Sequence, residues 1–104
     1  MNAATIVREV PASHPAFAGH FPGQPLLPGV SLLAEVMEAA QAQPGLAGRL
    51  DGHSQLQAAK FLAPVRPGST LHIGLQWDTA GLRFEVHCAG TLAAKGQWSW
   101  SAGE

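Results

Sequence analysis

Hydrophobic and polar residues alternate in four segments of the chain, residues 4–10, 70–78, 82–89 and 91–100, as expected of half-buried strands. The apolar positions that share a face in the last three are Leu71, Ile73, Leu75 and Trp77, then Leu82, Phe84, Val86 and Cys88, then Leu92, Ala94, Trp98 and Trp100. Residues 55–65 are also strand-like, and they end at the turn Arg66-Pro67-Gly68. The pattern predicts an antiparallel meander with one buried face.

Residues 29–43 show helical periodicity instead. The helix is expected to begin after Pro28 and to end before Pro44. Its apolar positions are Val30, Leu32, Leu33, Ala34, Val36, Met37, Ala39 and Ala40, and its narrow polar edge is Ser31, Glu35 and Glu38. A helix that is apolar over most of its circumference is expected to be buried. The predicted fold class is therefore α+β, with an antiparallel sheet wrapped around one long central helix.

The composition favours one domain, residues 1–104, that is covered in part by another subunit. The chain is 46% hydrophobic and 12% charged, and its net charge is −1. A chain of this length buries a limited share of its surface, and a small sheet has exposed edges. We therefore expect a dimer.

Several classes of function are not expected. The six basic residues are scattered along the sequence, so no patch for nucleic acid is visible: Arg8, Arg49, Lys60, Arg66, Arg83 and Lys95. No apolar run reaches the roughly 20 residues of a membrane span, and the N-terminal residues do not resemble a signal peptide. With Cys88 as the single cysteine, we expect a cytoplasmic protein.

The loop before the helix carries the chemistry. In Gly19-His20-Phe21-Pro22-Gly23-Gln24-Pro25-Leu26-Leu27-Pro28-Gly29-Val30, a histidine sits among prolines and a glycine opens the helix. Free N–H groups at a helix start can polarise a thioester carbonyl, and Gly29 allows its close approach. An imidazole such as that of His20 could remove the α-proton. A surface or hydrogen-bonding role is the alternative for a loop histidine.

The spacing of this loop resembles the signature of the β-hydroxyacyl-acyl-carrier-protein dehydratases, the FabA/FabZ group. A second segment, Lys60-Phe61-Leu62-Ala63-Pro64-Val65-Arg66-Pro67-Gly68-Ser69, is similar to the family's strand and turn. The resemblance implies a dimeric hotdog fold and a (3R)-hydroxyacyl-thioester dehydratase, a lyase of fatty-acid or polyene-type biosynthesis. It implies that His20 is the base and that the Gly29 amide holds the carbonyl.

The resemblance also implies the substrate and the partners. Phe21, Pro28, Val30 and Ala34 would contact a substrate carried on the phosphopantetheine of an acyl carrier protein or on coenzyme A. No bound cofactor and no metal are expected. Lys60 and Arg66 are candidate contacts for the acidic carrier, with ordinary solvated charges as the alternative.

The sequence departs from the family at one position. The family places Glu or Asp fourteen residues after the histidine, where this chain has Ala34. Glu35 is the next residue and a possible substitute acid, but one helical step turns a side chain by about 100°. A partner subunit could supply the carboxylate, since each family site combines residues of both chains. The pattern is similar to the short dehydratase-like subunits of aryl-polyene pathways.

Two other functions stay open. The chain could be a non-catalytic subunit that binds the acyl carrier, which fits Ala34, or a hotdog acyl thioesterase, which the histidine-proline loop disfavours. The remaining histidines offer no competing site. His87 and Cys88 face opposite ways on a strand, and the spacings among His14, His53 and His72 are not those of a metal site.

Overall fold

The computed structural model describes residues 2–11, 13, 27, 29–46 and 54–100. These residues form one helix and five strands, in the order β1 (Asn2–Glu9), α1 (Gly29–Gln41), β2 (Gln55–Phe61), β3 (Thr70–Trp77), β4 (Gly81–Cys88) and β5 (Thr91–Ser99). The predicted strands and the helix are all present. The helix begins at the predicted residue and ends two residues before the predicted one.

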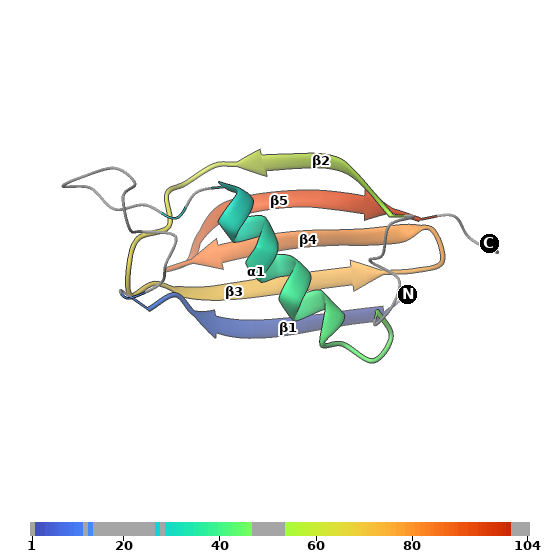
Figure 1. Ribbon diagram of the computed structural model, residues 1–104, viewed down its shortest axis with the longest axis horizontal. Coiled ribbons are helices and arrows are strands. Elements are labelled where there is room, and N and C mark those ends of the chain that lie inside the picture. Colours follow the sequence, from blue (N-terminus) through green and yellow to red (C-terminus); the bar gives the residue numbers. More distant parts are fainter. Residues whose placement is uncertain (1, 12, 14–26, 28, 47–53, 101–104) are drawn as a thin grey trace.

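The five strands form one sheet in the order β1-β3-β4-β5-β2, with every neighbouring pair antiparallel. The meander of β3, β4 and β5 is confirmed. The prediction that β2 belongs to the same continuous meander is wrong, because β2 pairs with β5 at the far edge of the sheet (Figure 1). The connection from β2 to β3 crosses the end of the sheet. There the Leu62 N–H donates to the Ala93 carbonyl (2.8 Å), and the Gly68 N–H donates to the Val10 carbonyl (2.7 Å).

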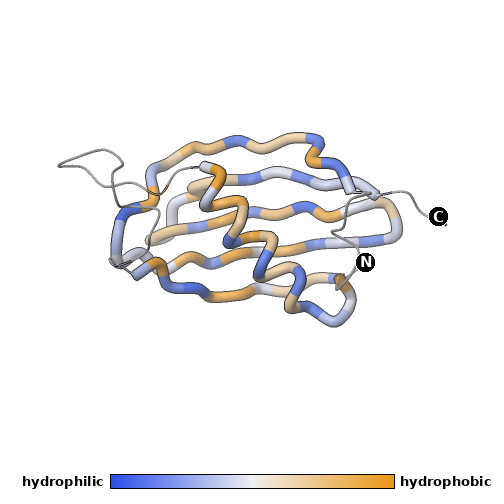
Figure 2. The backbone as a smooth tube through the Cα atoms, viewed as in Figure 1, coloured by the Kyte–Doolittle hydropathy of each residue, from blue (hydrophilic) through white to orange (hydrophobic). Residues whose placement is uncertain are grey.

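Helix α1 lies diagonally across one face of the sheet, with its first turn on the β2 side and its last turn over β1 (Figure 1). The core between helix and sheet contains the alternating positions predicted in β3 and β4. Figure 2 shows the same alternation as changes of hydropathy along the strands. The buried helix residues are Leu32, Val36, Ala39 and Ala40. The rings of Phe84 and Trp98, 5.1 Å apart, pack under them on β4 and β5.

The face predicted for β5 needs a correction. Ala93 and Ala94 are both buried, although neighbouring strand residues normally face opposite sides. The pairing shifts from Val86 opposite Ala94 to His87 opposite Leu92, which leaves Ala93 as an extra residue on β5. This bulge also changes which β5 side chains reach the core, and Leu92 is only partly buried.

The prediction that α1 is buried over most of its circumference is wrong for the single chain. Val30 is 77% exposed and Ala34 is also exposed, whereas Leu33 and Met37 are partly buried. One side of the helix therefore packs on the sheet, and the other stays open. Among the described residues, no helix is both long enough and apolar enough to pass through a membrane.

Candidate active site

The structure describes only part of the predicted site. His20, Phe21 and Pro28 lie outside the described residues. Leu27, Gly29 and the whole of α1 are described. These residues show how the end of the proline-rich loop enters the helix and what surrounds the first helical turn.

The two sequence segments that carry the family resemblance meet in space. Leu27 is buried, and its N–H donates to the carbonyl of Val65 at 2.7 Å. Val65 is buried too and belongs to the segment that follows β2. This contact anchors the residue two positions before Gly29. Segments that lie more than thirty residues apart in the sequence therefore form one structural unit at the helix start.

Gly29 is the first residue of α1, and the ring of Phe61 lies directly against it. A Cβ at position 29 would lie 3.0 Å from Cζ of Phe61, closer than side chains normally pack. The first N–H groups of an α-helix have no partner within the helix, and they carry the positive end of its dipole. The glycine therefore serves two purposes here. It makes room for the Phe61 ring, and it leaves the backbone at the helix start approachable.

The surroundings of Gly29 are apolar and open. Three of the large hydrophobic side chains that remain exposed are Val30, next to Gly29, and Phe61 and Leu62, at the end of β2. A fourth, Leu56, lies further along the same strand. β2 is an edge strand, so one side of its backbone has no neighbour within this sheet. We call Val30, Leu56, Phe61 and Leu62 the exposed apolar surface.

Ala34 lies one helical turn after Val30, on the open side of α1. A carboxylate at this position, as the resemblance would require, would project from the helix away from the sheet. The chain has a methyl group there instead. Position 34 therefore contributes no acidic group to the exposed apolar surface.

Glu35 points to a different neighbour. Its carboxylate Oε2 lies 3.5 Å from Nε of Arg8, and the Glu35 side chain is only 14% exposed. Arg8 also contacts Oε2 of Glu38 at 3.6 Å and donates from Nη1 to the Glu35 carbonyl oxygen at 3.4 Å. These contacts place the Glu35 carboxylate at β1, the edge of the sheet opposite β2. In this arrangement Glu35 ties the helix to β1.

Sequence reasoning missed the role of Arg8, although a signal was present. Arg8 shares the inward face of β1 with Ala4 and Ile6, which both pack against the core. A charged residue in an inward-facing row is expected to have an acidic partner. The polar edge of the helix supplies that partner.

Within the part of the chain that the structure describes, the other candidates do not form a second centre, and His14 and His53 lie outside that part. His87 lies on the outer face of β4, whereas Cys88 packs against the core. His72 is on the outer face of β3, opposite His87. Among the described residues, no three His, Cys, Asp or Glu side chains lie close enough together to bind a metal ion.

The architecture described above, one antiparallel sheet with a single helix across it, is that of the hotdog fold. A solved structure with this arrangement is the dehydratase heterocomplex ApeI:P from Xenorhabdus doucetiae. It aligns with a TM-score of 0.79 and 33% identity over 93% of this chain and 85% of that one. The family model of the ApeI-like dehydratases (ApeI dehydratase) matches residues 1–97. The chain belongs to this ApeI-like dehydratase family.

Curated relatives point the same way. The chain is 34% identical over 93 residues to the 3-hydroxyacyl-[acyl-carrier-protein] dehydratase FabZ of Rhizobium rhizogenes, a match that covers 84% of this chain. It is 41% identical over 73 residues to FabZ of Chloroflexus aggregans, which covers 66% of this chain. The matches span 59% and 51% of those two relatives.

Proposed function

We propose that this chain is the histidine-bearing subunit of a two-chain dehydratase that acts on 3-hydroxyacyl thioesters. The proposal rests on the difference between the two sides of α1. Gly29 and the open, apolar side of the first turns form a surface without an acid, and the neighbouring Glu35 is engaged with Arg8. A site of this kind can bind an acyl thioester and remove a proton. It needs a proton donor from elsewhere.

The reaction assigns one step to each group. The helix-start N–H at Gly29 donates a hydrogen bond to the thioester carbonyl oxygen, which acidifies the α-proton and stabilises the enolate. His20 takes that proton as the Cα–H bond breaks. The electron pair forms the Cα=Cβ bond, the Cβ–O bond breaks, and the hydroxyl leaves as water with a proton from a carboxylic acid. The products are an enoyl thioester and water.

The exposed apolar surface supports a partner as the source of that acid. Val30 and Phe61 are large, exposed and adjacent to Gly29, and β2 is an edge strand with no further neighbour among the described strands. A second dehydratase-like chain with Glu or Asp at the position of Ala34 would cover this surface and bring its carboxylate with it. The assembly of the related ApeI:P protein as a heterocomplex is consistent with such a pair.

We propose an acyl carrier protein as the donor of the substrate. Arg66 lies in the exposed turn directly after Val65, whose carbonyl holds Leu27. A carrier that contacts Arg66 would deliver its phosphopantetheine beside the helix start. Lys60 is less well placed for this task, because it lies on the outer face of β2 next to Lys95.

Reconstitution tests the proposal. The chain is purified alone and together with a dehydratase-like chain from the same organism that has a carboxylate at the Ala34 position. Formation of the enoyl thioester from a 3-hydroxyacyl carrier is then followed. We expect the pair to be about 10²–10⁴ times faster than the chain alone, a typical contribution of a general acid. Equal rates would contradict the need for a partner.

The second candidate function, a non-catalytic subunit that binds the carrier, is favoured by the same alanine. In that case the pair would be active, but a pair containing His20→Ala would be equally active. Release of free thiol instead of enoyl product would indicate the third candidate, a thioesterase.

A further inference from the structure

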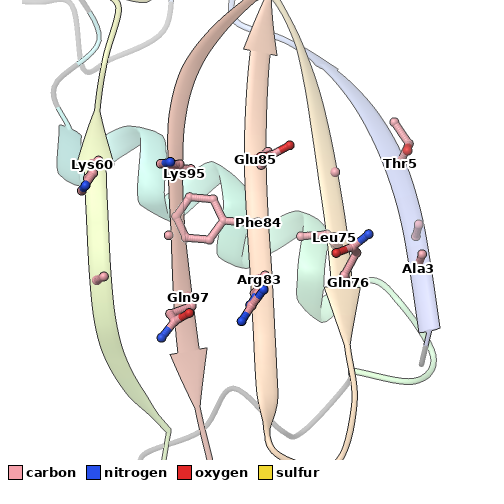
Figure 3. A pocket seen from close by; sticks show the side chains of 14 residues that line it. Ala3, Thr5, Lys60, Leu75, Gln76, Arg83, Phe84, Glu85, Lys95 and Gln97 are labelled. Atoms are coloured by element: carbon pink, nitrogen blue, oxygen red, sulfur yellow. The ribbon is translucent and has the colours of Figure 1, made fainter.

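The face of the sheet opposite α1 contains a groove of about 500 Å³ that residues from all five strands line (Figure 3). It lies away from the candidate active site, since Gly29, Val30 and the ring of Phe61 against Gly29 are on the helix side of the sheet. Figure 3 views this outer face with the helix behind the strands. The groove lies within the range of volumes that small-molecule sites occupy.

Three cations line the groove: Lys60 on β2, Arg83 on β4 and Lys95 on β5. These are half of the six basic residues of the chain. These three are scattered along the sequence, but alternation on different strands brings them to one face of the sheet. The single carboxylate in the lining is that of Glu85, so the groove carries three positive charges and one negative, a net +2.

These charges are arranged unfavourably for the chain by itself. Lys60 and Lys95 are direct cross-strand partners on β2 and β5, a like-charge pair that destabilises a sheet. Glu85 lies opposite Lys95 on the other side. Even so, the ion pairs found among the described residues all belong to Arg8, and none involves a groove cation. Glu85 therefore makes no close ion pair with Lys95 in this arrangement.

The shape of the groove and its uncharged amide side chains also suit an anion. Arg83 lies between Gln76 and Gln97 in register, so two amide side chains flank the guanidinium. Gly74 lies opposite Glu85, and a Cβ there would meet only the Glu85 carbonyl oxygen, at 3.7 Å. The absent side chain leaves a hollow in the outer face. The Glu85 carboxylate borders this hollow, and the three cations lie on the β4, β5 and β2 side of it, with the two lysines beyond Glu85 in register.

We propose that this groove binds a small phosphate-bearing molecule, such as a phosphate ester or an oligophosphate. A guanidinium with flanking donors matches phosphate oxygens, and lysines supply further point charges. A phosphate dianion would neutralise the net +2 of the groove and relieve the repulsion between Lys60 and Lys95. The inference is independent of the proposed dehydratase function, because it uses the opposite face of the sheet.

Titration with inorganic pyrophosphate tests the proposal on the folded chain, with amide NMR shifts as the readout. We expect saturable shifts confined to the outer-face strands, with a dissociation constant below about 1 mM. Arg83→Gln and Lys95→Gln should each weaken binding about 10-fold, as expected for a lost charge-assisted contact. Gly74→Glu should also weaken binding, since a second carboxylate beside Glu85 lowers the net charge of the groove from +2 to +1.

Arg66→Gln is the matched control, because it removes the same charge from an exposed turn outside the groove. We expect it to leave the pyrophosphate affinity unchanged. Equal weakening by Arg66→Gln, or binding of citrate as tight as that of pyrophosphate, would show general charge attraction and overturn the proposal. The absence of saturable shifts below about 10 mM would overturn it too.

Discussion

The two sides of helix α1 meet different surroundings. On the side toward β1, Arg8 contacts the carboxylates of both Glu35 and Glu38. On the open side, Val30 and Ala34 are exposed, and the ring of Phe61 lies against Gly29. One helix thus combines a side that is fixed to its own sheet with a side that the described residues leave uncovered.

This difference explains why the open side has no acidic group although Glu35 is the next residue after Ala34. Glu35 is adjacent to Ala34 in sequence, yet its carboxylate is directed to β1 and held there by Arg8. To serve the open side it would have to leave that contact and turn around the helix by about 100°. On our proposal the fixed side stabilises the fold, and the open side is completed by another subunit.

The largest effect is expected from His20→Ala. Removal of a general base should lower the single-turnover dehydration rate of the reconstituted pair by about 10²–10⁴-fold. The melting temperature should change little, because a loop histidine contributes little to the core. His72→Ala is the control, since His72 is exposed on the outer face of β3. A rate unaffected by His20→Ala would remove His20 as the base.

A smaller effect is expected at the start of the open side. Gly29→Val should reduce kcat/KM for the acyl thioester by about 10–100-fold, because the side chain blocks access to the helix-start N–H. It should also press on Phe61, 3.0 Å from any Cβ at this position. The pair Gly29→Ala and Gly29→Ala/Phe61→Ala separates the two causes. Recovery of activity in the double variant would show that the glycine serves ring packing alone.

The smallest effect is expected on the fixed side. Arg8→Gln should reduce the free energy of unfolding by about 0.5–1 kcal/mol, as for a partly exposed ion-pair network, without changing the turnover of the pair. Urea unfolding and the dehydration assay measure the two quantities. Glu35→Gln should behave in the same way. If Glu35→Gln instead abolished turnover while the fold persisted, Glu35 would be the acid.

The sequence predicted the elements better than their arrangement. Alternation of Leu71, Ile73 and Leu75 determined both the strand and its buried face, because the period of a strand is local. The place of β2 beside β5 could not be predicted, since β2 is mostly exposed and shows no clear buried face. The bulge at Ala93 was hidden for a related reason, because two adjacent alanines fit either register.

The site shows the same limit. Gly29 and the alanine at position 34 were identifiable because the proline-rich loop fixes their spacing. The contact between Glu35 and Arg8 joins residues 27 apart in the chain, and the groove of Lys60, Arg83 and Lys95 joins three strands. Such contacts depend on strand order and register, which local patterns do not specify.

The most direct test of the central claim is to return the acid to the open side. Single-turnover dehydration of a 3-hydroxyacyl thioester is measured for the chain without a partner, as wild type, Ala34→Glu and Ala34→Gln. We expect Ala34→Glu to be faster than wild type by about 10²–10⁴-fold and Ala34→Gln to match wild type, because only the carboxylic acid can protonate the leaving hydroxyl. Combining Ala34→Glu with His20→Ala should remove the gain. A wild-type chain that is already fast alone, and that Ala34→Glu leaves unchanged, would contradict the account.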